Sequence, residues 1–176
     1  MKAIFLDIDG VLNCSSSKSR CGSLLGVDKA KVKILAEIVD STGADLILSS
    51  SWKVGWEPKG RYSAYDEPHA KYLDAHLKKK GGLVCKDKTR ERNLAERGMG
   101  IKSYLLLHPE YTEWIVIDDE IFGDYPSRGI LPHLIKTDAA KGLTKKDADA
   151  AIKMLRGEII GPYGSDSPTM ELDVIL

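Results

Sequence analysis

The sequence predicts an α/β domain built on a doubly wound parallel sheet of about five strands. Two observations support this class. Short apolar runs alternate along the chain with segments in which apolar residues recur at helical spacing. Three of the apolar runs are followed at once by polar side chains, and open α/β sheets bind their ligands at the carboxyl ends of their strands. We therefore expect helices on both faces of the sheet and a ligand site at its carboxyl edge.

The beginning of the chain supplies two strands around one helix. Ala3–Ile8 is a mostly apolar run of strand length. Asn13–Gly26 is rich in serine and glycine and is expected to be a loop. Asp28 is the expected N-cap of a helix with apolar residues at helical spacing, which ends at Gly43. Ala44–Leu48 is the second apolar run and the second predicted strand.

In the middle of the chain, glycines and prolines mark the ends of the predicted elements, and the spacing of apolar residues indicates their type. Trp52–Glu67 contains glycines, a proline and several aromatic residues, and is expected to be irregular. His69–Lys80 has helical spacing and stops at two glycines. Leu83–Cys85 predicts a short third strand. Leu94–His108 predicts a helix that two glycines weaken near its start.

The last third of the chain predicts two more strands and one helix. Trp114–Ile117 is an apolar run, and His133–Lys136 is a shorter one. Thr144 is the expected N-cap of a helix over Lys145–Leu155, whose apolar residues share one face. Strands that alternate with helices in this way are typical of a parallel sheet.

Composition excludes several classes of protein. Lysine plus arginine and aspartate plus glutamate both number 26, so the formal net charge is zero and no global field favours nucleic acid or a membrane. No apolar stretch approaches the roughly 20 residues of a membrane span. The three cysteines lack zinc-ligand spacing, so a reduced cytoplasmic protein is expected. Charge is nevertheless uneven, since residues 78–102 hold nine basic and three acidic side chains, which could attract an anionic substrate beside the site.

Acidic and hydroxyl side chains follow three of the predicted strands. Asp7 and Asp9 end the first, Ser49 ends the second, and Asp118 with Asp119 ends the fourth. Carboxylates held this close repel one another unless a cation or a shared proton intervenes. Oxygen-only ligands favour Mg²⁺, which often completes its shell with water and substrate phosphate. One carboxylate beside such a metal can attack phosphorus, and a second can protonate the leaving oxygen.

This arrangement resembles motifs I, II and IV of the haloacid dehalogenase (HAD) superfamily of phosphatases, and the resemblance covers nearly the whole chain. It implies that Asp7 is the nucleophile and that Asp9 is the general acid/base. The backbone carbonyl of Ile8 or of Asp9 would face the metal, and the family pattern favours Asp9. The resemblance also implies that Ser49 binds the phosphoryl group. Asp7, Asp118 and Asp119 would ligate Mg²⁺ through their carboxylates.

A second stretch refines this resemblance. Lys136–Asp138 together with Gly142–Thr144 is similar to the corresponding part of a small HAD-like subgroup associated with RNA repair proteins. This similarity narrows the resemblance from the superfamily to that subgroup.

HAD phosphatases also use a lysine or arginine that steadies the phosphoryl charge, and three residues are candidates here. Arg97 precedes a glycine at the start of a predicted helix. Lys102 lies a turn and a half further along, where it would point away from the strand ends. Lys53 follows Ser49 by four residues. We favour Arg97, because the start of that helix lies nearer the carboxyl edge of the sheet.

The spacing of the motifs predicts an open site without a large cap domain. One loop, one helix and one strand occupy the interval between Asp7 and Ser49. We expect a core over residues 1–157, a loop insertion near 53–68, and a tail over 158–176 to which no role is assigned. An open site suits a phosphoryl group on a large molecule. It also suits a small substrate if loops or a second subunit of an oligomer close over it.

Two functions are compatible with these features. The first is a Mg²⁺-dependent phosphatase that forms an aspartyl-phosphate at Asp7, with a nucleotide or a polynucleotide end as a candidate substrate. The alternative is a catalytically weak HAD-fold module that binds nucleic acid or a protein. The aromatic cluster of Trp52, Trp56, Tyr62 and Tyr65 leaves a similar choice open, because it could stack on a base or simply pack a loop onto the body.

Overall fold

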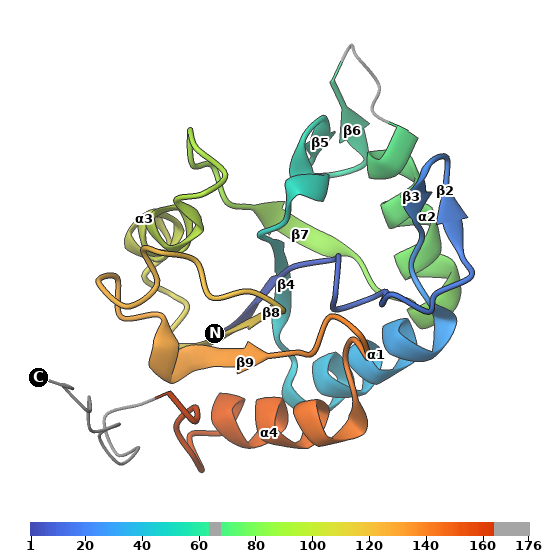
Figure 1. Ribbon diagram of the computed structural model, residues 1–176. Coiled ribbons are helices and arrows are strands. Elements are labelled where there is room, and N and C mark those ends of the chain that lie inside the picture. The colour runs from blue at the N-terminus through green and yellow to red at the C-terminus, as the bar shows by residue number, and fades with distance from the viewer. Residues whose placement is uncertain (64–67, 164–176) are drawn as a thin grey trace, which may run out of the picture.

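The computed structural model describes residues 1–63 and 68–163, and within them a five-stranded parallel sheet forms the centre of the molecule (Figure 1). The strand order is β7-β4-β1-β8-β9. The strands are β1 (Lys2–Leu6), β4 (Asp45–Leu48), β7 (Cys85–Lys88), β8 (Glu113–Asp118) and β9 (Leu134–Lys136). The chain builds the sheet outwards from β1 to one edge and then crosses back to build the other. This confirms the predicted doubly wound α/β class.

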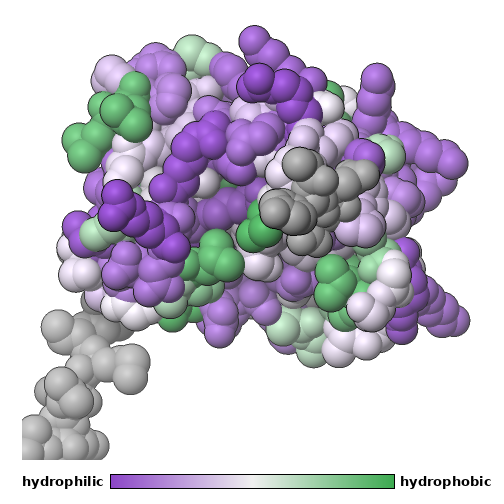
Figure 2. Space-filling view, turned by 90° about the horizontal axis from the view of Figure 1, so that it is seen from above, coloured by the Kyte–Doolittle hydropathy of each residue, from purple (hydrophilic) through white to green (hydrophobic). Residues whose placement is uncertain are grey.

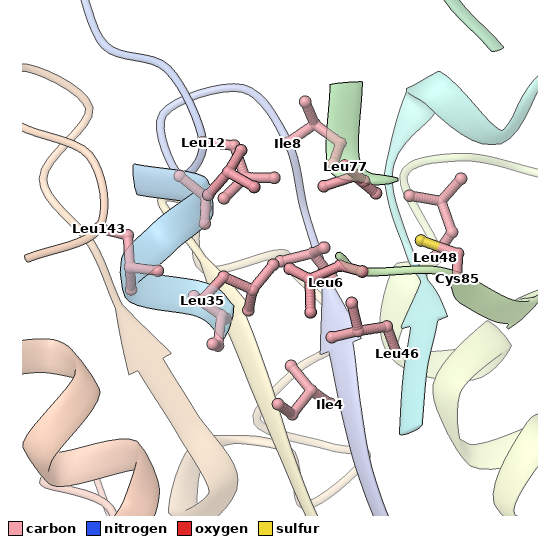
Figure 3. Packing of buried hydrophobic residues seen from close by; sticks show 14 of the residues in the cluster. Ile4, Leu6, Ile8, Leu12, Leu35, Leu46, Leu48, Leu77, Cys85 and Leu143 are labelled. Carbon is pink, nitrogen blue, oxygen red and sulfur yellow. The ribbon is translucent and has the colours of Figure 1, made fainter. Parts of the chain in front are cut away.

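Helices cover both faces of this sheet. The helices are α1 (Lys29–Thr42), α2 (Pro68–Gly81), α3 (Arg97–Leu107) and α4 (Lys145–Leu155). On one face, α1 packs between α2 and α4. Figure 3 shows Leu35 of α1 close to Ile4 and Leu6 of β1 on this face. On the other face, Phe5 meets Tyr104 of α3 edge-on, with ring centroids 5.7 Å apart.

Period-two alternation explains why β1 can serve both layers. Ile4 and Leu6 belong to the core under α1, whereas Ala3 and Phe5 belong to the core under α3. All four side chains are fully buried. A strand that is buried on both faces reads as a continuous apolar run, which is the pattern that predicted it.

Two stretches that were expected to be loops contain small hairpins. Between β1 and α1 lie β2 (Arg20–Cys21) and β3 (Leu24–Leu25). After β4 lie the 3₁₀ turn η1 (Ser51–Lys53) and the hairpin of β5 (Trp56–Glu57) and β6 (Arg61–Tyr62). Strands of two residues are too short to show any periodicity, so the sequence could not reveal them. This small hairpin lies within the expected insertion near 53–68, and the residues of that stretch that the structure describes form no large cap domain.

The remaining differences lie at the ends of elements. β7 begins two residues later than predicted and includes Asp87 and Lys88, because an edge strand tolerates polar residues that hide its pattern. α3 begins at Arg97 and not at Leu94. The short 3₁₀ turn η2 (Leu131–His133) precedes β9. Each helix within the described residues is too short or too polar to cross a bilayer.

Local chemistry sets the ends of the two helices whose caps were predicted. Thr144 forms a capping box with Asp147, in which each side chain accepts a hydrogen bond from the backbone N–H of the other residue. Asp28 occupies the N-cap position of α1, but its side chain accepts a hydrogen bond from Ser17 and makes no cap bond. Gly43 ends α1 in the left-handed conformation, with φ of 66°.

Removal of the α4 capping box is expected to lower stability without changing the fold. Thr144→Ala should reduce the free energy of unfolding by about 1 kcal/mol, which corresponds to a fall in Tm of about 2–4 °C. Thr144→Ser keeps a hydroxyl acceptor and should lose much less. Thermal unfolding followed by circular dichroism measures both, with Thr112→Ala at an exposed position as the control. Equal melting of Thr144→Ala and Thr112→Ala would contradict the assignment.

Candidate functional site

The carboxyl ends of the central strands are joined by one row of backbone hydrogen bonds. The N–H of Asp7 donates to the carbonyl of Ile117, at 2.9 Å, and the N–H of Ser49 donates to the carbonyl of Leu6, also at 2.9 Å. The N–H of Thr137 donates to the carbonyl of Asp118, at 2.9 Å. Each residue that follows a strand is thus held by its neighbour, so side chains from distant parts of the sequence lie together at this edge.

Three carboxylates gather at this edge. Asp7, Asp118 and Asp119 each offer an oxygen that lies within 4.8 Å of the others. Asp7 and Asp118 are buried, and Asp119 is half-buried. A cluster of acidic oxygens without nitrogen or sulfur donors matches the preference of Mg²⁺. These three residues could therefore hold a divalent cation.

Gly10 allows the turn after β1 to pass directly beside this cluster. Its φ is 66°, and a Cβ atom built on it would lie 2.1 Å from Oδ2 of Asp119. Any other residue would both strain the backbone and displace the carboxylate. The hydroxyl of Thr137 donates to the carbonyl of Gly10, at 2.8 Å, which fixes the turn to the end of β9.

Arg97 is the cation that the structure brings to the carboxylates. Its Nη1 lies 3.1 Å from Oδ1 of Asp7 and 2.7 Å from Oδ2 of Asp118. The guanidinium is buried, and its central carbon lies 4.1 Å from the centroid of the Phe122 ring. Burial by itself lowers the pKa of Arg97, but the charges of Asp7 and Asp118 outweigh it and raise that pKa, so the group stays charged. Tyr125 adds a hydrogen bond from its hydroxyl to Oδ2 of Asp118, at 2.9 Å.

A distant acid positions the helix that carries Arg97. The Asp124 carboxylate accepts from the backbone N–H of Gly98 at 3.1 Å and from that of Met99 at 2.8 Å, so it caps the first turn of α3. A Cβ on Gly98 would come within 2.9 Å of this carboxylate. Gly98 lowers the intrinsic helix propensity of this segment, but the absence of a side chain there leaves room for the Asp124 carboxylate that caps the helix. Asp124 follows the Asp118–Asp119 pair by a few residues, but no sequence spacing reveals this long-range contact.

Burial sets the direction of the pKa shifts in the cluster. It is the main cause that raises the pKa of Asp7 to about 7; Arg97 lowers this pKa, and Asp118 raises it further. Burial and the neighbouring Asp118 charge also raise the pKa of Asp119. Arg97 thus offsets only part of the effect of burial on Asp7. A divalent cation bound at the carboxylates would favour their charged forms.

The hydroxyl of Ser49 is buried without a partner. Its Oγ makes no hydrogen bond to any residue that the structure describes, and the side chain is 1% exposed. A buried polar atom in this state costs about 1–3 kcal/mol. It lies at the same edge as Asp7, where an oxygen of a phosphoryl group could accept its proton. This feature supports the role that the resemblance implied for Ser49.

Asp9 occupies a separate position. It is exposed, its Oδ1 accepts from the Asn13 side chain at 2.8 Å, and its Oδ2 accepts from the indole N–H of Trp52 at 2.9 Å. Its carboxylate is not part of the cluster of three. Two donors therefore orient an acid that faces solvent, which suits proton transfer to a substrate. Neither Asn13 nor Trp52 was a predicted site residue, although both lie next to predicted motifs.

The aromatic cluster packs the loop after β4 onto the body. Trp52 and Trp56 are 2% and 1% exposed, so they cannot serve as a stacking platform. The indole N–H of Trp56 donates to Asp74 at 2.8 Å, and the hydroxyl of Tyr62 donates to the same carboxylate at 2.9 Å. Tyr65 lies outside the described residues.

The other two basic candidates do not contact the carboxylates. Lys102 places its Nζ 5.5 Å from the ring centroid of Trp114, near the start of β8 and hence at the opposite edge of the sheet from Asp118. Lys53 is buried, pairs with Glu91 and donates to the hydroxyl of Thr89 at 2.8 Å. Burial lowers the pKa of Lys53, whereas Glu91 raises it.

Comparison with known proteins agrees with this geometry. A family model described as the HAD domain in Swiss Army Knife RNA repair proteins matches residues 3–148. Searches of curated proteins and of solved structures returned no match. The matched range contains four strands of the sheet in full, all of β1 except Lys2, and every residue of the carboxylate cluster. The chain therefore belongs to the family of HAD domains found in Swiss Army Knife RNA repair proteins.

Proposed function

We propose that this protein hydrolyses phosphoric monoesters with Mg²⁺ and forms an aspartyl-phosphate at Asp7. Membership of the family supports a HAD-type hydrolase in general. One observation carries the finer proposal: Arg97 contacts Asp7 at the strand edge where the hydroxyl of Ser49 is buried without a partner. A nucleophile, a fixed positive charge and a free donor are the groups that a phosphoryl-transfer site requires.

The metal would be held by carboxylate oxygens. Asp7, Asp118 and Asp119 supply them, and the backbone carbonyl of Asp9 is the further ligand that the family pattern implies. When bound, Mg²⁺ would neutralise negative charge on the phosphoryl oxygens and on the carboxylates. The oxygen-only donor set and the raised pKa values of Asp7 and Asp119 both fit this ion.

The chain's own residues would then perform two successive displacements. A carboxylate oxygen of Asp7 attacks phosphorus as the bond to the ester oxygen breaks, and Asp9 donates a proton to that leaving oxygen. Arg97 and Ser49 hold the non-bridging oxygens. Asp9 next removes a proton from a water molecule, which attacks the phosphorus of the aspartyl-phosphate. Phosphate leaves and the carboxylate of Asp7 is regenerated.

The substrate we propose is a phosphorylated nucleotide or nucleic-acid end. The description of the family connects its members with RNA repair proteins. The open site and the solvent-exposed position of Asp9 also fit a leaving group that is part of a large molecule. Hydrolysis of p-nitrophenyl phosphate, a mononucleotide, and 5′- and 3′-phosphorylated oligonucleotides, each with and without Mg²⁺, would test this proposal. Tight nucleic-acid binding without turnover on any of them would favour the alternative of a binding module.

The nucleophile can be tested by an isosteric change. Asp7→Asn removes the attacking oxygen charge and should abolish Mg²⁺-dependent phosphate release, because no aspartyl-phosphate can form. Mass spectrometry of the wild-type protein, quenched with acid during turnover, should show a phosphate adduct on Asp7 that the variant lacks. Hydrolysis at the wild-type rate by Asp7→Asn would overturn the mechanism.

The proposed role of Arg97 can be tested by comparing its alanine variant with that of Lys102, which lies at the opposite edge of the sheet. Arg97→Ala should lower kcat/KM by about 10²–10³-fold, because it removes a fixed donor to the phosphoryl oxygens. Lys102→Ala should change it by less than about twofold, since Lys102 lies over Trp114. Parallel kinetics with p-nitrophenyl phosphate compare the two variants. The reverse order of effects would contradict the proposed role of Arg97.

The raised pKa of Asp7 makes metal-free stability depend on pH. The folded-state pKa of about 7 lies above the ordinary aspartate value of 3.8, so the folded protein loses stability as pH rises between these values. Asp7→Asn removes this loss and should therefore be more stable than wild type at pH 8 but not at pH 4. About three pKa units correspond to at most about 4 kcal/mol.

Urea unfolding in EDTA at both pH values measures this difference. Asp149→Asn, at an exposed position on α4, is the matched control. Addition of Mg²⁺ at pH 8 should stabilise the wild type more than Asp7→Asn. A pH-independent difference between Asp7→Asn and wild type would contradict the raised pKa of the buried Asp7 carboxylate.

A further inference from the structure

A basic groove lies beside the carboxylate site. It has a volume of about 510 Å³, within the usual range of ligand sites, and its walls include Lys53, Val54, Lys88, Arg90, Arg92 and Leu94. We call these six residues the basic groove. In Figure 1, the segment that joins β7 to α3 and the β5–β6 hairpin both rise above the carboxyl edge of the sheet. Figure 2, the view from above, shows that hydrophilic residues cover much of this face.

Backbone and side-chain contacts connect the groove to the site. The N–H of Thr89, a further wall residue, donates to the carbonyl of Leu48 at 3.0 Å, immediately before Ser49. The buried Lys53 donates to the hydroxyl of Thr89 and pairs with Glu91. Glu91 in turn lies against the first turn of α3, because a Cβ on Gly100 would come within 2.2 Å of its carboxylate. Two residues of the groove wall, Thr89 and Glu91, therefore lie next to the strand end that carries Ser49 and the helix start that carries Arg97.

Basic side chains outnumber acidic ones in the groove. Four cationic side chains line it, and Glu91, which Lys53 already engages, is the one acid among the described wall residues. Lys88 and Arg90 also contact Glu57, at 2.9 and 3.3 Å, and Arg90 contacts Asp87 at 3.2 Å. The Arg90 side chain is 56% exposed, and exposed pairs of this kind contribute about 0–1 kcal/mol, so an incoming anion can compete for this arginine.

Four of the nine cations in residues 78–102 lie at the groove or at the site. Lys88, Arg90 and Arg92 line the groove, and Arg97 lies in the site. Lys86 instead pairs with Asp45, at the start of β4. Although the net charge of the chain is zero, part of its positive charge thus lies beside Asp7.

We propose that the basic groove binds the phosphodiester backbone of a polynucleotide whose terminal phosphate lies at Asp7. This inference rests on the proposed function and narrows its substrate class. A nucleoside monophosphate has a single phosphate, which would bind at Asp7, so no anion would remain to bind the groove. Arginine matches phosphate through two parallel N–H donors. Val54 and Leu94, which are 48% and 41% exposed, offer apolar surface to a sugar or base.

Charge-reversal variants in the groove test this proposal through RNA binding, which is measured without any hydrolysis. The probe is a fluorescein-labelled 12-mer of single-stranded RNA without terminal phosphates, titrated in EDTA across a series of salt concentrations. The variant is Arg90→Glu/Arg92→Glu, and the control is Lys78→Glu/Lys79→Glu, which makes the same charge change on exposed residues of α2. Circular dichroism melts compare the folding of the two variants.

The groove variant should bind the RNA at least about tenfold more weakly than wild type at 50 mM salt. The slope of log affinity against log salt should fall in magnitude by about 1.4, since each lost contact to a single strand contributes about 0.7. The control should remain within about twofold of wild type. Equal weakening by both variants, no weakening by the groove variant, or equally tight binding of poly-glutamate would overturn the proposal.

A second measurement separates this inference from the proposed function. Hydrolysis of p-nitrophenyl phosphate by the wild-type protein tests the chemistry alone, because this substrate has no backbone for the groove. RNA binding that depends on the groove without hydrolysis would leave the groove proposal in place and contradict the phosphatase. Hydrolysis of p-nitrophenyl phosphate without RNA binding that depends on the groove would support the phosphatase and contradict the groove proposal.

Discussion

The gathering of three carboxylates at one sheet edge, two of them buried, is the constraint on which the rest of the structure depends. Parallel strands in register deliver Asp7 and Asp118 to the same place, and their charges cannot be left uncompensated in a buried site. Arg97 contacts both of them. Burial nevertheless raises the pKa of Asp7, although Arg97 lowers it. The cluster could hold a further cation, which would favour the charged form of this carboxylate.

Much of the chain after β7 serves to hold Arg97 in that position. Asp124 caps the first turn of α3, Phe122 covers the guanidinium, and Tyr125 shares the oxygen of Asp118 that Arg97 contacts. All three belong to the segment that follows β8. The end of β8 and the segment after it thus supply two acids of the cluster, Asp118 and Asp119, and the supports of Arg97. A change in any of these supports would alter the charge balance at Asp7.

The two acids of the first motif differ because their surroundings differ. Asp7 is buried beside Arg97, whereas Asp9 is exposed and oriented by Asn13 and Trp52. Burial and a fixed cation suit a nucleophile, and exposure with an oriented carboxylate suits proton transfer to a leaving group. The basic groove extends the same edge towards solvent, so the proposed chemistry and the proposed recognition of a nucleic-acid end share one surface. This continuity accounts for a strongly uneven charge distribution in a chain of zero net charge.

The sequence by itself determined the α/β class, the order of the main elements and the acids at the strand ends. These features follow from local patterns: the apolar runs of β1 and β8 are buried on both faces, and Thr144 caps α4 through residues only three positions away. It could not place the hairpins, because strands of two residues have no measurable period. Only the tertiary structure showed that Arg97, and not Lys102 or Lys53, contacts the carboxylates, and only it joined Asp124 to α3 and Trp52 to Asp9. Such contacts depend on how helices and loops pack across the sheet, and the spacing of residues along the chain does not encode that packing directly.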